Sequence, residues 1–190
     1  MSTGRELEAA LAEQIGGGRL AHSYRVLETA RELAGRFGAP LAQAEQAALM
    51  HDYCRKLSAP VLLAEARQRN LIVDPAEVAE PLLLHGPVAA AWLGERGLVT
   101  DPQALAAIRW HTTGRAGMTL LEKVIWLADY IEPGRRFAGV EPVREAAGQD
   151  LDTALLLALD QTISYAIANG WQLHLYTIQA RNSLLPTKDA

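Results

Sequence analysis

Most histidines of this 190-residue chain lie on or beside apolar stripes of predicted helices, where ionisable groups are costly unless paired or bound to a metal. The ionisable residues that share such positions are His22, His51, Asp52, His85, His111 and Asp129. Imidazole with carboxylate is a donor set that suits iron, manganese, nickel, cobalt or zinc. The set predicts one buried metal site; for Asp129 alone, a buried ion pair with Lys123 or an arginine is the competing interpretation.

The spacing of these residues restricts how they can meet. His51 and Asp52 are adjacent, and neighbours on a helix point about 100° apart, so both can face one ion only near a helix end. The turn expected before Ser58 supplies such an end. His22 and Asp129 must then come from two other helices, which predicts a metal held between three helices of a bundle.

The elements that must position these residues are expected to be helices throughout. Hydrophobic residues make up 49% of the chain, aromatic residues 6%, and the 3.6-residue period recurs almost everywhere. The predicted helices span about 7–15, 19–37, 41–53, 58 onward, 74–84, 88–96, 101–111, 119–131, 150–169 and 177–185. We expect a break at 85–87, a loop at 133–136, and an all-α fold.

The domain organisation expected from this pattern is a single domain over 1–190. Its metal core covers about 19–132, and C-terminal helices of about 150–185 pack on that core. The length suits one domain with a sizeable hydrophobic core.

Composition also restricts partners and location. The net charge is −4 and no long basic run occurs, which argues against a nucleic-acid partner. The single cysteine, Cys54, cannot form an internal disulfide, and no thiolate cluster is available for a structural zinc site. The N-terminus lacks a signal pattern, and the apolar stretches are too short or too broken for a bilayer span. We expect a cytoplasmic protein without membrane contact and with the capacity to form a homodimer.

The ordered set of His22, the His51-Asp52 doublet and Asp129 resembles the HD-domain metal-dependent phosphohydrolases. Four longer strings look like the small bacterial HD proteins that hydrolyse diadenosine tetraphosphate symmetrically, and the likeness covers nearly the whole chain. The strings are LHGPV at 84–88, IRWHTTG at 108–114, LADYIEPGR at 127–135 and TIQARN at 177–182. The family usually reads His-Asp-Tyr-Ala-Lys-Asp-Leu at the doublet; here Lys56 replaces an acid, which either alters the phosphate pocket or is surface variation.

The resemblance implies an HD-domain helical bundle that cleaves one dinucleotide substrate into two ADP. The implied metal ligands are His22, His51, Asp52 and Asp129, and Asp52 or Asp129 would also orient the attacking water. Iron is the preferred metal, with one ion favoured over two.

Two roles are open for His85 and His111. They either bind phosphate and donate a proton to the leaving ADP, which we favour, or ligate a second metal. The other predicted phosphate contacts are Thr112, Arg55 and Arg135, with Arg115 and Arg136 as weaker candidates. The adenine is expected to stack on one of the tryptophans or on Tyr130, near His174 and Arg181.

Three alternatives compete with this function. An HD phosphohydrolase could instead act on nucleoside monophosphates, deoxynucleoside triphosphates or guanosine alarmones. A non-catalytic, metal-stabilised nucleotide-binding regulator would bind without turnover. A plain helical interaction module would hold no metal.

Overall fold

The computed structural model describes residues 4–186, and within this range every regular element is a helix. The elements are α1 (Gly4–Ile15), α2 (Gly17–Phe37), α3 (Leu41–Met50), α4 (Ala59–Gln68), α5 (Ala76–Ala79), the 3₁₀ helix η1 (Pro81–Leu84), α6 (His85–Glu95), α7 (Pro102–Trp110), α8 (Leu120–Ile131), α9 (Val140–Ala147), α10 (Leu151–Ala168) and α11 (Leu175–Ser183). The all-α prediction is confirmed.

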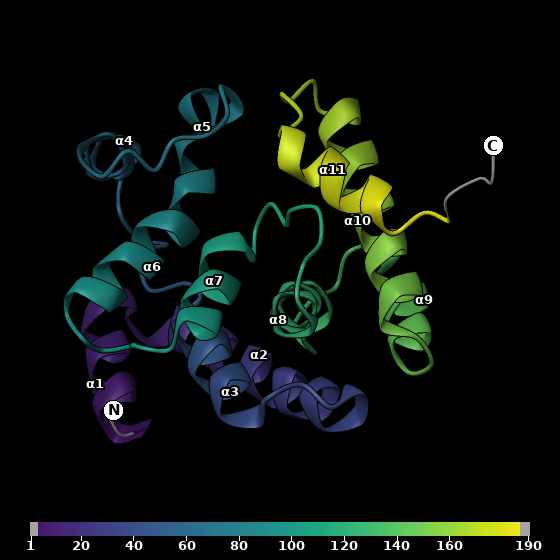
Figure 1. Cartoon of the computed structure of the whole chain (residues 1–190), viewed down its shortest axis with the longest axis horizontal. Coiled ribbons are helices and arrows are strands. Elements are labelled where there is room, and N and C mark those ends of the chain that lie inside the picture. The colour runs from purple at the N-terminus through teal and green to yellow at the C-terminus, as the bar shows by residue number, and fades with distance from the viewer. Residues whose placement is uncertain (1–3, 187–190) are drawn as a thin grey trace.

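Helix α8 forms the centre of the bundle and packs against α2, α3, α7, α9 and α10 (Figure 1). Its start is fixed by a capping box, in which Thr119 and Glu122 each satisfy a backbone N–H of the other. Leu121, Ile125 and Leu127 are fully buried among its neighbours. Each such side chain contributes about 1.5–3 kcal/mol by burial, so the position of Asp129 in the last turn of this helix is firmly held.

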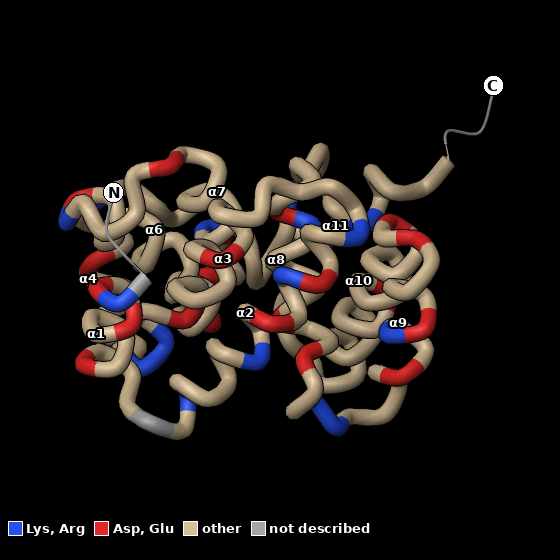
Figure 2. The backbone as a smooth tube through the Cα atoms, turned by 90° about the horizontal axis from the view of Figure 1, so that it is seen from below, with Lys and Arg blue, Asp and Glu red and all other residues tan. Residues whose placement is uncertain are grey.

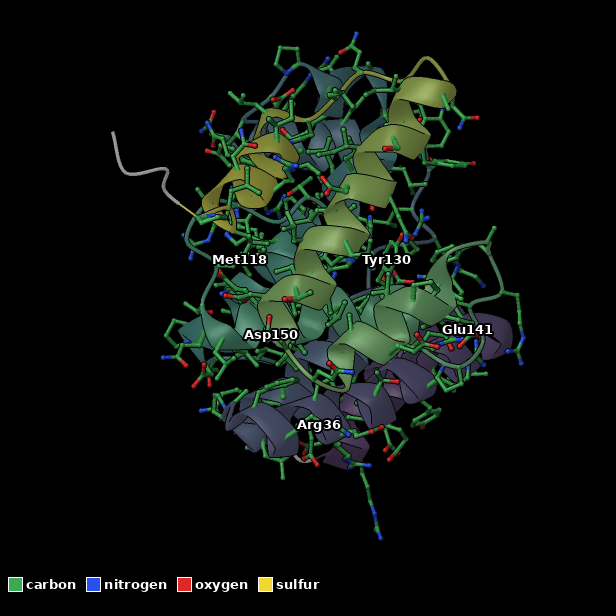
Figure 3. The ribbon with its side chains drawn as sticks, turned by 90° about the vertical axis from the view of Figure 1, so that its right-hand side faces the viewer. Arg36, Met118, Tyr130, Glu141 and Asp150 are labelled. Atoms are coloured by element: carbon green, nitrogen blue, oxygen red, sulfur yellow. The ribbon has the colours of Figure 1, made fainter. Side chains whose placement is uncertain are left out.

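The last three helices of the chain, α9, α10 and α11, lie together on one side of this core (Figures 1 and 3). Asp150 caps α10 by accepting a hydrogen bond of 2.7 Å from the backbone N–H of Thr153. α10 then packs on α8, α9 and α11, so the C-terminal helices form one wall over the end of the core.

Helix α9 (Val140–Ala147) was not among the predicted helices, which left 137–149 without an assigned element. This short helix is fixed by tertiary contacts. Arg144 donates hydrogen bonds to the backbone carbonyls of Ile131 and Glu132, at 2.9 and 2.7 Å. A segment of eight residues is too short to be stable as an isolated helix, so these contacts are needed to hold it.

Further boundaries differ from the prediction, among them the helix expected at 74–84, which is divided into α5 and η1. The expected break at 85–87 is absent, since α6 starts at His85 and carries Pro87 in its first turn, where the missing proline N–H has no helical partner to lose. The predicted helix 41–53 instead ends at Met50, and turns follow it. His51 and Asp52 therefore lie just beyond the end of α3, as their spacing requires.

Charged residues of both signs alternate over the described helices (Figure 2). Within residues 4–186, no helix is both long enough and apolar enough to cross a membrane.

Candidate metal centre

Five segments that are distant in sequence bring six ionisable side chains to one point. α2 supplies His22, the turn after α3 supplies His51 and Asp52, and α8 supplies Asp129. His22 Nε2 lies 3.3 Å from His51 Nε2 and 3.1 Å from Asp129 Oδ1. His85 at the start of α6 and His111 at the end of α7 complete the group, with their Nε2 atoms 2.9 Å apart. His85 Nε2 is also 3.2 Å from Asp52 Oδ1.

Three of the histidines are oriented by the same device. The Nδ1 atoms of His51, His85 and His111 lie 2.6–2.7 Å from the backbone carbonyl oxygen three residues earlier, at Ala48, Leu82 and Ile108. The carbonyls of Ala48 and Ile108 lie in the last turns of α3 and α7, where carbonyls lack a helical partner, and that of Leu82 also accepts the backbone N–H of His85. A carbonyl only accepts hydrogen bonds, so each Nδ1 carries a proton, and a ring without a second proton presents its Nε2 lone pair to the centre.

His22 is oriented by a carboxylate instead. Its Nδ1 lies 3.2 Å from Glu132 Oε1, and Glu132 Oε2 accepts hydrogen bonds of 2.5 Å from Arg25 Nε and from the backbone N–H of Gly134. A buried carboxylate behind a histidine is a common support for a metal ligand, since it fixes the ring and raises its basicity. Burial alone would lower the pKa of His22, but its hydrogen bond to Asp129 and the charge of that residue raise the pKa above 6.5.

The two aspartates remain ionised despite their surroundings. Burial opposes ionisation of Asp52, but His51 and His85 hold the pKa of its carboxyl well below the usual range. For Asp129, burial is again outweighed, here by the hydrogen bond to His22 and the charges nearby, and the pKa is lowered. Two carboxylates are thus available as anionic ligands at neutral pH.

The chemistry of this donor set fits a cation. Burial, with His85 and His51 beside it, lowers the pKa of His111 to about 3, so this imidazole is neutral at physiological pH. The facing Nε2 lone pairs of His85 and His111 repel each other unless a proton or a cation lies between them. Two overlapping groups have ligand atoms close enough to share an ion: His22, His51 and Asp129, and His51, Asp52 and His111. The residues present therefore fit one or two divalent cations.

Close approach of α6 to α7 is needed to place His85 against His111. Gly86 makes it possible, because a Cβ atom there would lie 2.9 Å from the carbonyl oxygen of Ile108 and 3.0 Å from that of Arg109. These distances are shorter than any ordinary contact, so only glycine fits without moving a helix.

Arginines surround the opening of the site, a polar cavity of about 180 Å³. Arg19 Nη1 donates to Asp52 Oδ2 at 3.4 Å, and Arg55 Nε lies 3.7 Å from Asp52 Oδ1. Arg135 pairs with the Asp129 carboxylate and donates from Nε to the Asp129 carbonyl at 2.9 Å. Thr112 Oγ1 lies 3.2 Å from His111 Nε2 in the same cavity. This arrangement can bind an anion beside the cation site.

The structure brings together every residue that the sequence analysis placed in the metal and phosphate sites, with two weaker candidates outside the cavity lining. Arg115 forms a bidentate ion pair with Glu122 at the start of α8, and Arg136 does not line the cavity. The exposed Lys56 lies by Gly16 and outside the cavity, so this departure from the family pattern is at the surface.

Two participants were missed, Arg19 and Glu132. Each is three residues from a predicted ligand, Arg19 before His22 and Glu132 after Asp129, and this helical spacing could have revealed both.

Comparison with known proteins places this site in a family. The HD domain profile matches residues 19–134, which include the four predicted metal ligands. A crystal structure of a predicted HD superfamily hydrolase involved in NAD metabolism, from Clostridium acetobutylicum, superposes with a TM-score of 0.92 at 38% identity and covers 97% of each chain. The chain belongs to the HD-domain family.

Curated relatives narrow the family further. The proteins named symmetrical bis(5'-nucleosyl)-tetraphosphatase from Bacillus subtilis and Halalkalibacterium halodurans are 42% and 40% identical to the chain, over 84% and 88% of its length and 86% and 89% of theirs. The protein of that name from Staphylococcus aureus is 35% identical over 90% of this chain and 88% of its own. Within the HD-domain family, the chain belongs to the family of these tetraphosphatases.

Proposed function

We propose that the protein hydrolyses diadenosine tetraphosphate symmetrically, so that one substrate molecule and one water give two ADP. The observation that carries this proposal is the convergence of imidazole lone pairs and ionised aspartates inside a ring of arginines. This combination suits attack on a phosphoanhydride, and it occurs in a chain whose relatives are named for that activity.

His22, His51, Asp52 and Asp129 would hold a divalent cation. When bound, such a cation polarises a phosphoryl oxygen and lowers the pKa of water toward neutrality. Asp52 and Asp129, kept ionised by their neighbours, are also placed to orient a water molecule through their remaining oxygen lone pairs.

The arginines have the complementary role of binding phosphate. Arg19, Arg55 and Arg135 bring positive charge to the cavity opening, where guanidinium groups can pair with phosphate oxygens and offset the charge that develops during cleavage. Arg135 is the best oriented of the three, since the Asp129 carbonyl fixes its Nε. The Thr112 hydroxyl adds a hydrogen-bond donor for the same phosphates.

From residue types alone, we favoured phosphate binding and proton donation as the role of His85 and His111. The geometry instead favours ligation of a second cation by these two residues. In each ring the Nδ1–H is engaged by a carbonyl, so the Nε2 atom facing the cavity can donate to phosphate only after protonation. A pKa of about 3 for His111 opposes that protonation at neutral pH. Metal analysis separates the two roles: two ions per wild-type chain and one in His111→Ala support the second cation, and one ion in both supports phosphate binding.

Finer features remain predictions. Iron is our preferred metal because nitrogen and carboxylate ligands without thiolate suit it, although manganese, nickel, cobalt and zinc share those preferences. We also predict a cytoplasmic location, no nucleic-acid partner and the capacity to form a homodimer. Elemental analysis of protein purified without added metal and light scattering of the same sample test the first and last of these.

A substrate panel tests the function. The purified protein, loaded with Fe²⁺ or Mn²⁺, is incubated with diadenosine tetraphosphate, and the products are separated by chromatography. ADP as the sole product is expected. AMP with ATP would contradict symmetrical cleavage. Turnover of a nucleoside monophosphate, a deoxynucleoside triphosphate, a guanosine alarmone or NAD, without turnover of diadenosine tetraphosphate, would replace the proposed substrate.

A further inference from the structure

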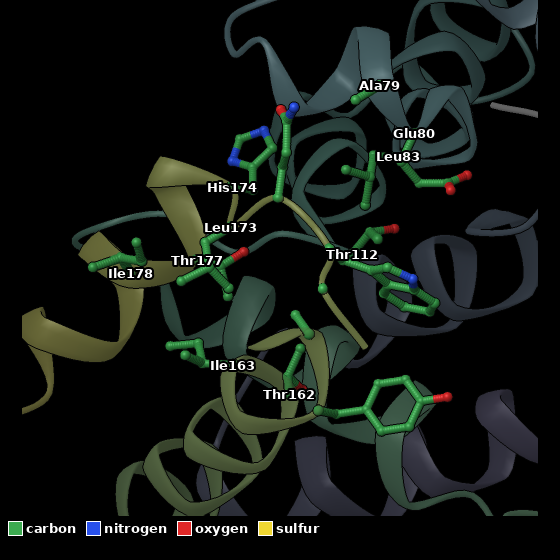
Figure 4. Close-up of a pocket in the computed structure, with 15 residues that line it drawn as sticks. Ala79, Glu80, Leu83, Thr112, Thr162, Ile163, Leu173, His174, Thr177 and Ile178 are labelled. Atoms are coloured by element: carbon green, nitrogen blue, oxygen red, sulfur yellow. The ribbon is translucent and has the colours of Figure 1, made fainter. Parts of the chain in front are cut away.

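A second cavity, of about 440 Å³, adjoins the metal centre and is mainly apolar. It lies between two parts of the chain that are far apart in sequence: α5 and η1 on one side, and α10, α11 and their connection on the other. Figure 4 shows labelled side chains from both sides, Leu83 and Ala79 against Ile163 and Leu173. Thr112 lines both this cavity and the polar cavity of the metal site, so the two cavities are neighbours at this residue.

The two sides of the cavity are joined by specific polar contacts. Asp74 Oδ2 accepts a hydrogen bond of 2.9 Å from the backbone N–H of Leu175. Nearby, His174 Nε2 lies 3.5 Å from Glu77 Oε1, and both side chains are buried. These contacts fix the separation of the sides, so the cavity is formed before a ligand arrives.

Two large aromatic side chains line the cavity while remaining open to solvent. Trp171 is 57% exposed and Tyr165 is 59% exposed. Their rings contact each other edge to face, with the two ring centroids 5.4 Å apart. Trp171 is held in place by the end of α10: Gly170 has a left-handed φ of 67°, and the backbone N–H of Trp171 bonds the Ala166 carbonyl at 2.9 Å. An exposed indole on a hydrogen-bonded backbone, beside a preformed apolar cavity, is suited to stacking on a flat ring.

We propose that this cavity, which we call the Trp171 pocket, binds a nucleoside of the substrate, with its base stacked on Trp171. The proposal rests on the proposed function, which supplies a substrate with a nucleoside at each end of a phosphate chain. The polar cavity of about 180 Å³ beside the arginines suits phosphate, and the larger apolar space reached past Thr112 suits the base. The pocket therefore distinguishes nucleotides from simple phosphates.

The competing place for the base is a smaller cavity of about 220 Å³ on the other side of Thr112 and Thr162. Its aromatic lining is Trp126, Tyr130 and Phe137, and it shares His111, Asp129 and Arg135 with the polar cavity. Trp126 is 3% exposed and stacks on Tyr130, the Tyr130 hydroxyl donates to Gln161, and Phe137, 41% exposed, contacts Tyr130 edge to face. The Trp171 pocket offers more free aromatic surface.

Calorimetric binding of ADP and of inorganic pyrophosphate to the metal-loaded protein tests the proposal. Trp171→Ala should weaken ADP binding about five- to tenfold, the lower part of the range for removing a base-stacking ring, and leave pyrophosphate binding unchanged. Trp171→Phe, which keeps a stacking face, should restore most of the ADP affinity. Ile167→Ala is the matched control, because Ile167 is an exposed apolar residue of the same helix end outside the cavity lining.

ADP affinity in Trp171→Ala equal to that of Ile167→Ala would overturn the proposal. A loss of ADP affinity in Phe137→Ala alone would also overturn it and place the base in the smaller cavity. Equal losses for ADP and pyrophosphate in Trp171→Ala would show a general disturbance of the site and reject base stacking. The binding of ADP and pyrophosphate is measured without turnover. Failure of the protein to hydrolyse diadenosine tetraphosphate would therefore overturn the proposed function, and the binding data could still be interpreted.

Discussion

Replacing Glu132 by glutamine should weaken metal binding although Glu132 is not a predicted metal ligand. The Glu132 carboxylate is buried and accepts hydrogen bonds from Arg25 Nε, the Gly134 N–H and His22 Nδ1. Glutamine keeps one acceptor oxygen and presents an NH₂ group in place of the other. That group meets either the donors of Arg25 and Gly134 or the Nδ1–H of His22, so at least one contact becomes donor against donor.

The magnitude follows from these contacts. Loss of a charge-assisted hydrogen bond costs about 1.5–3 kcal/mol of folding stability. The orientation and basicity of His22 depend on the same carboxylate, and changes to such supporting groups typically reduce metal affinity about 10- to 100-fold. We expect a reduction in this range for Glu132→Gln, with the fold retained.

The assay is competition for the metal with a chelator of known affinity, and the control is Glu122→Gln. Glu122 is equally buried, lies in the first turn of α8 whereas Glu132 follows its last residue, and pairs with Arg115. Its substitution should lower the unfolding temperature without changing metal affinity. If both variants bind metal as tightly as the wild type, the supporting role of Glu132 is refuted.

Three other predictions concern packing, pH and the thiol. Gly86→Ala should separate α6 from α7, because the added Cβ would lie 2.9 Å from the Ile108 carbonyl oxygen. The expected cost is about 1–3 kcal/mol of folding stability, together with loss of bound metal. An unchanged unfolding temperature and metal content would contradict this prediction. The pKa of His22 is raised above 6.5 in the cation-free protein, so a cation must displace the proton of this imidazole at lower pH. Metal affinity should therefore fall about tenfold per pH unit below that pKa. Chelator competition between pH 6 and 9 measures this dependence, and a metal affinity that does not change with pH would contradict it. Burial raises the pKa of the Cys54 thiol to about 12. A thiol reagent at pH 8 should therefore modify no cysteine in the native protein and one after denaturation. Rapid labelling of the native protein would contradict this prediction and show that the turn after α3, which carries His51 and Asp52, opens.

The helices and the candidate metal ligands could be identified from the sequence for one physical reason. The 3.6-residue period marks the buried face of each long helix, and an ionisable residue on that face signals a paired or ligating group. His22, His51 and Asp129 stand out in this way, and their order along the chain, matched to a known family, supported the prediction that they meet.

Features set by tertiary contact could not be predicted. Helix α9 depends on hydrogen bonds from Arg144 to carbonyls at the end of α8, and short local sequence does not reveal them. Arg115 looked available for phosphate, but the nearby Glu122 binds it instead. The proton positions on His85 and His111 depend on backbone carbonyls whose direction only the folded chain fixes.

ADP release from diadenosine tetraphosphate, measured together with metal content on the same sample, tests the proposed chemistry and its site at once. The wild type should release two ADP per substrate molecule. His51→Ala should lose both metal and ADP release, and Cys54→Ala, which changes a buried neighbour outside the cavity, should keep both. Full ADP release by His51→Ala, or bound metal without any ADP from the wild type, would contradict the account.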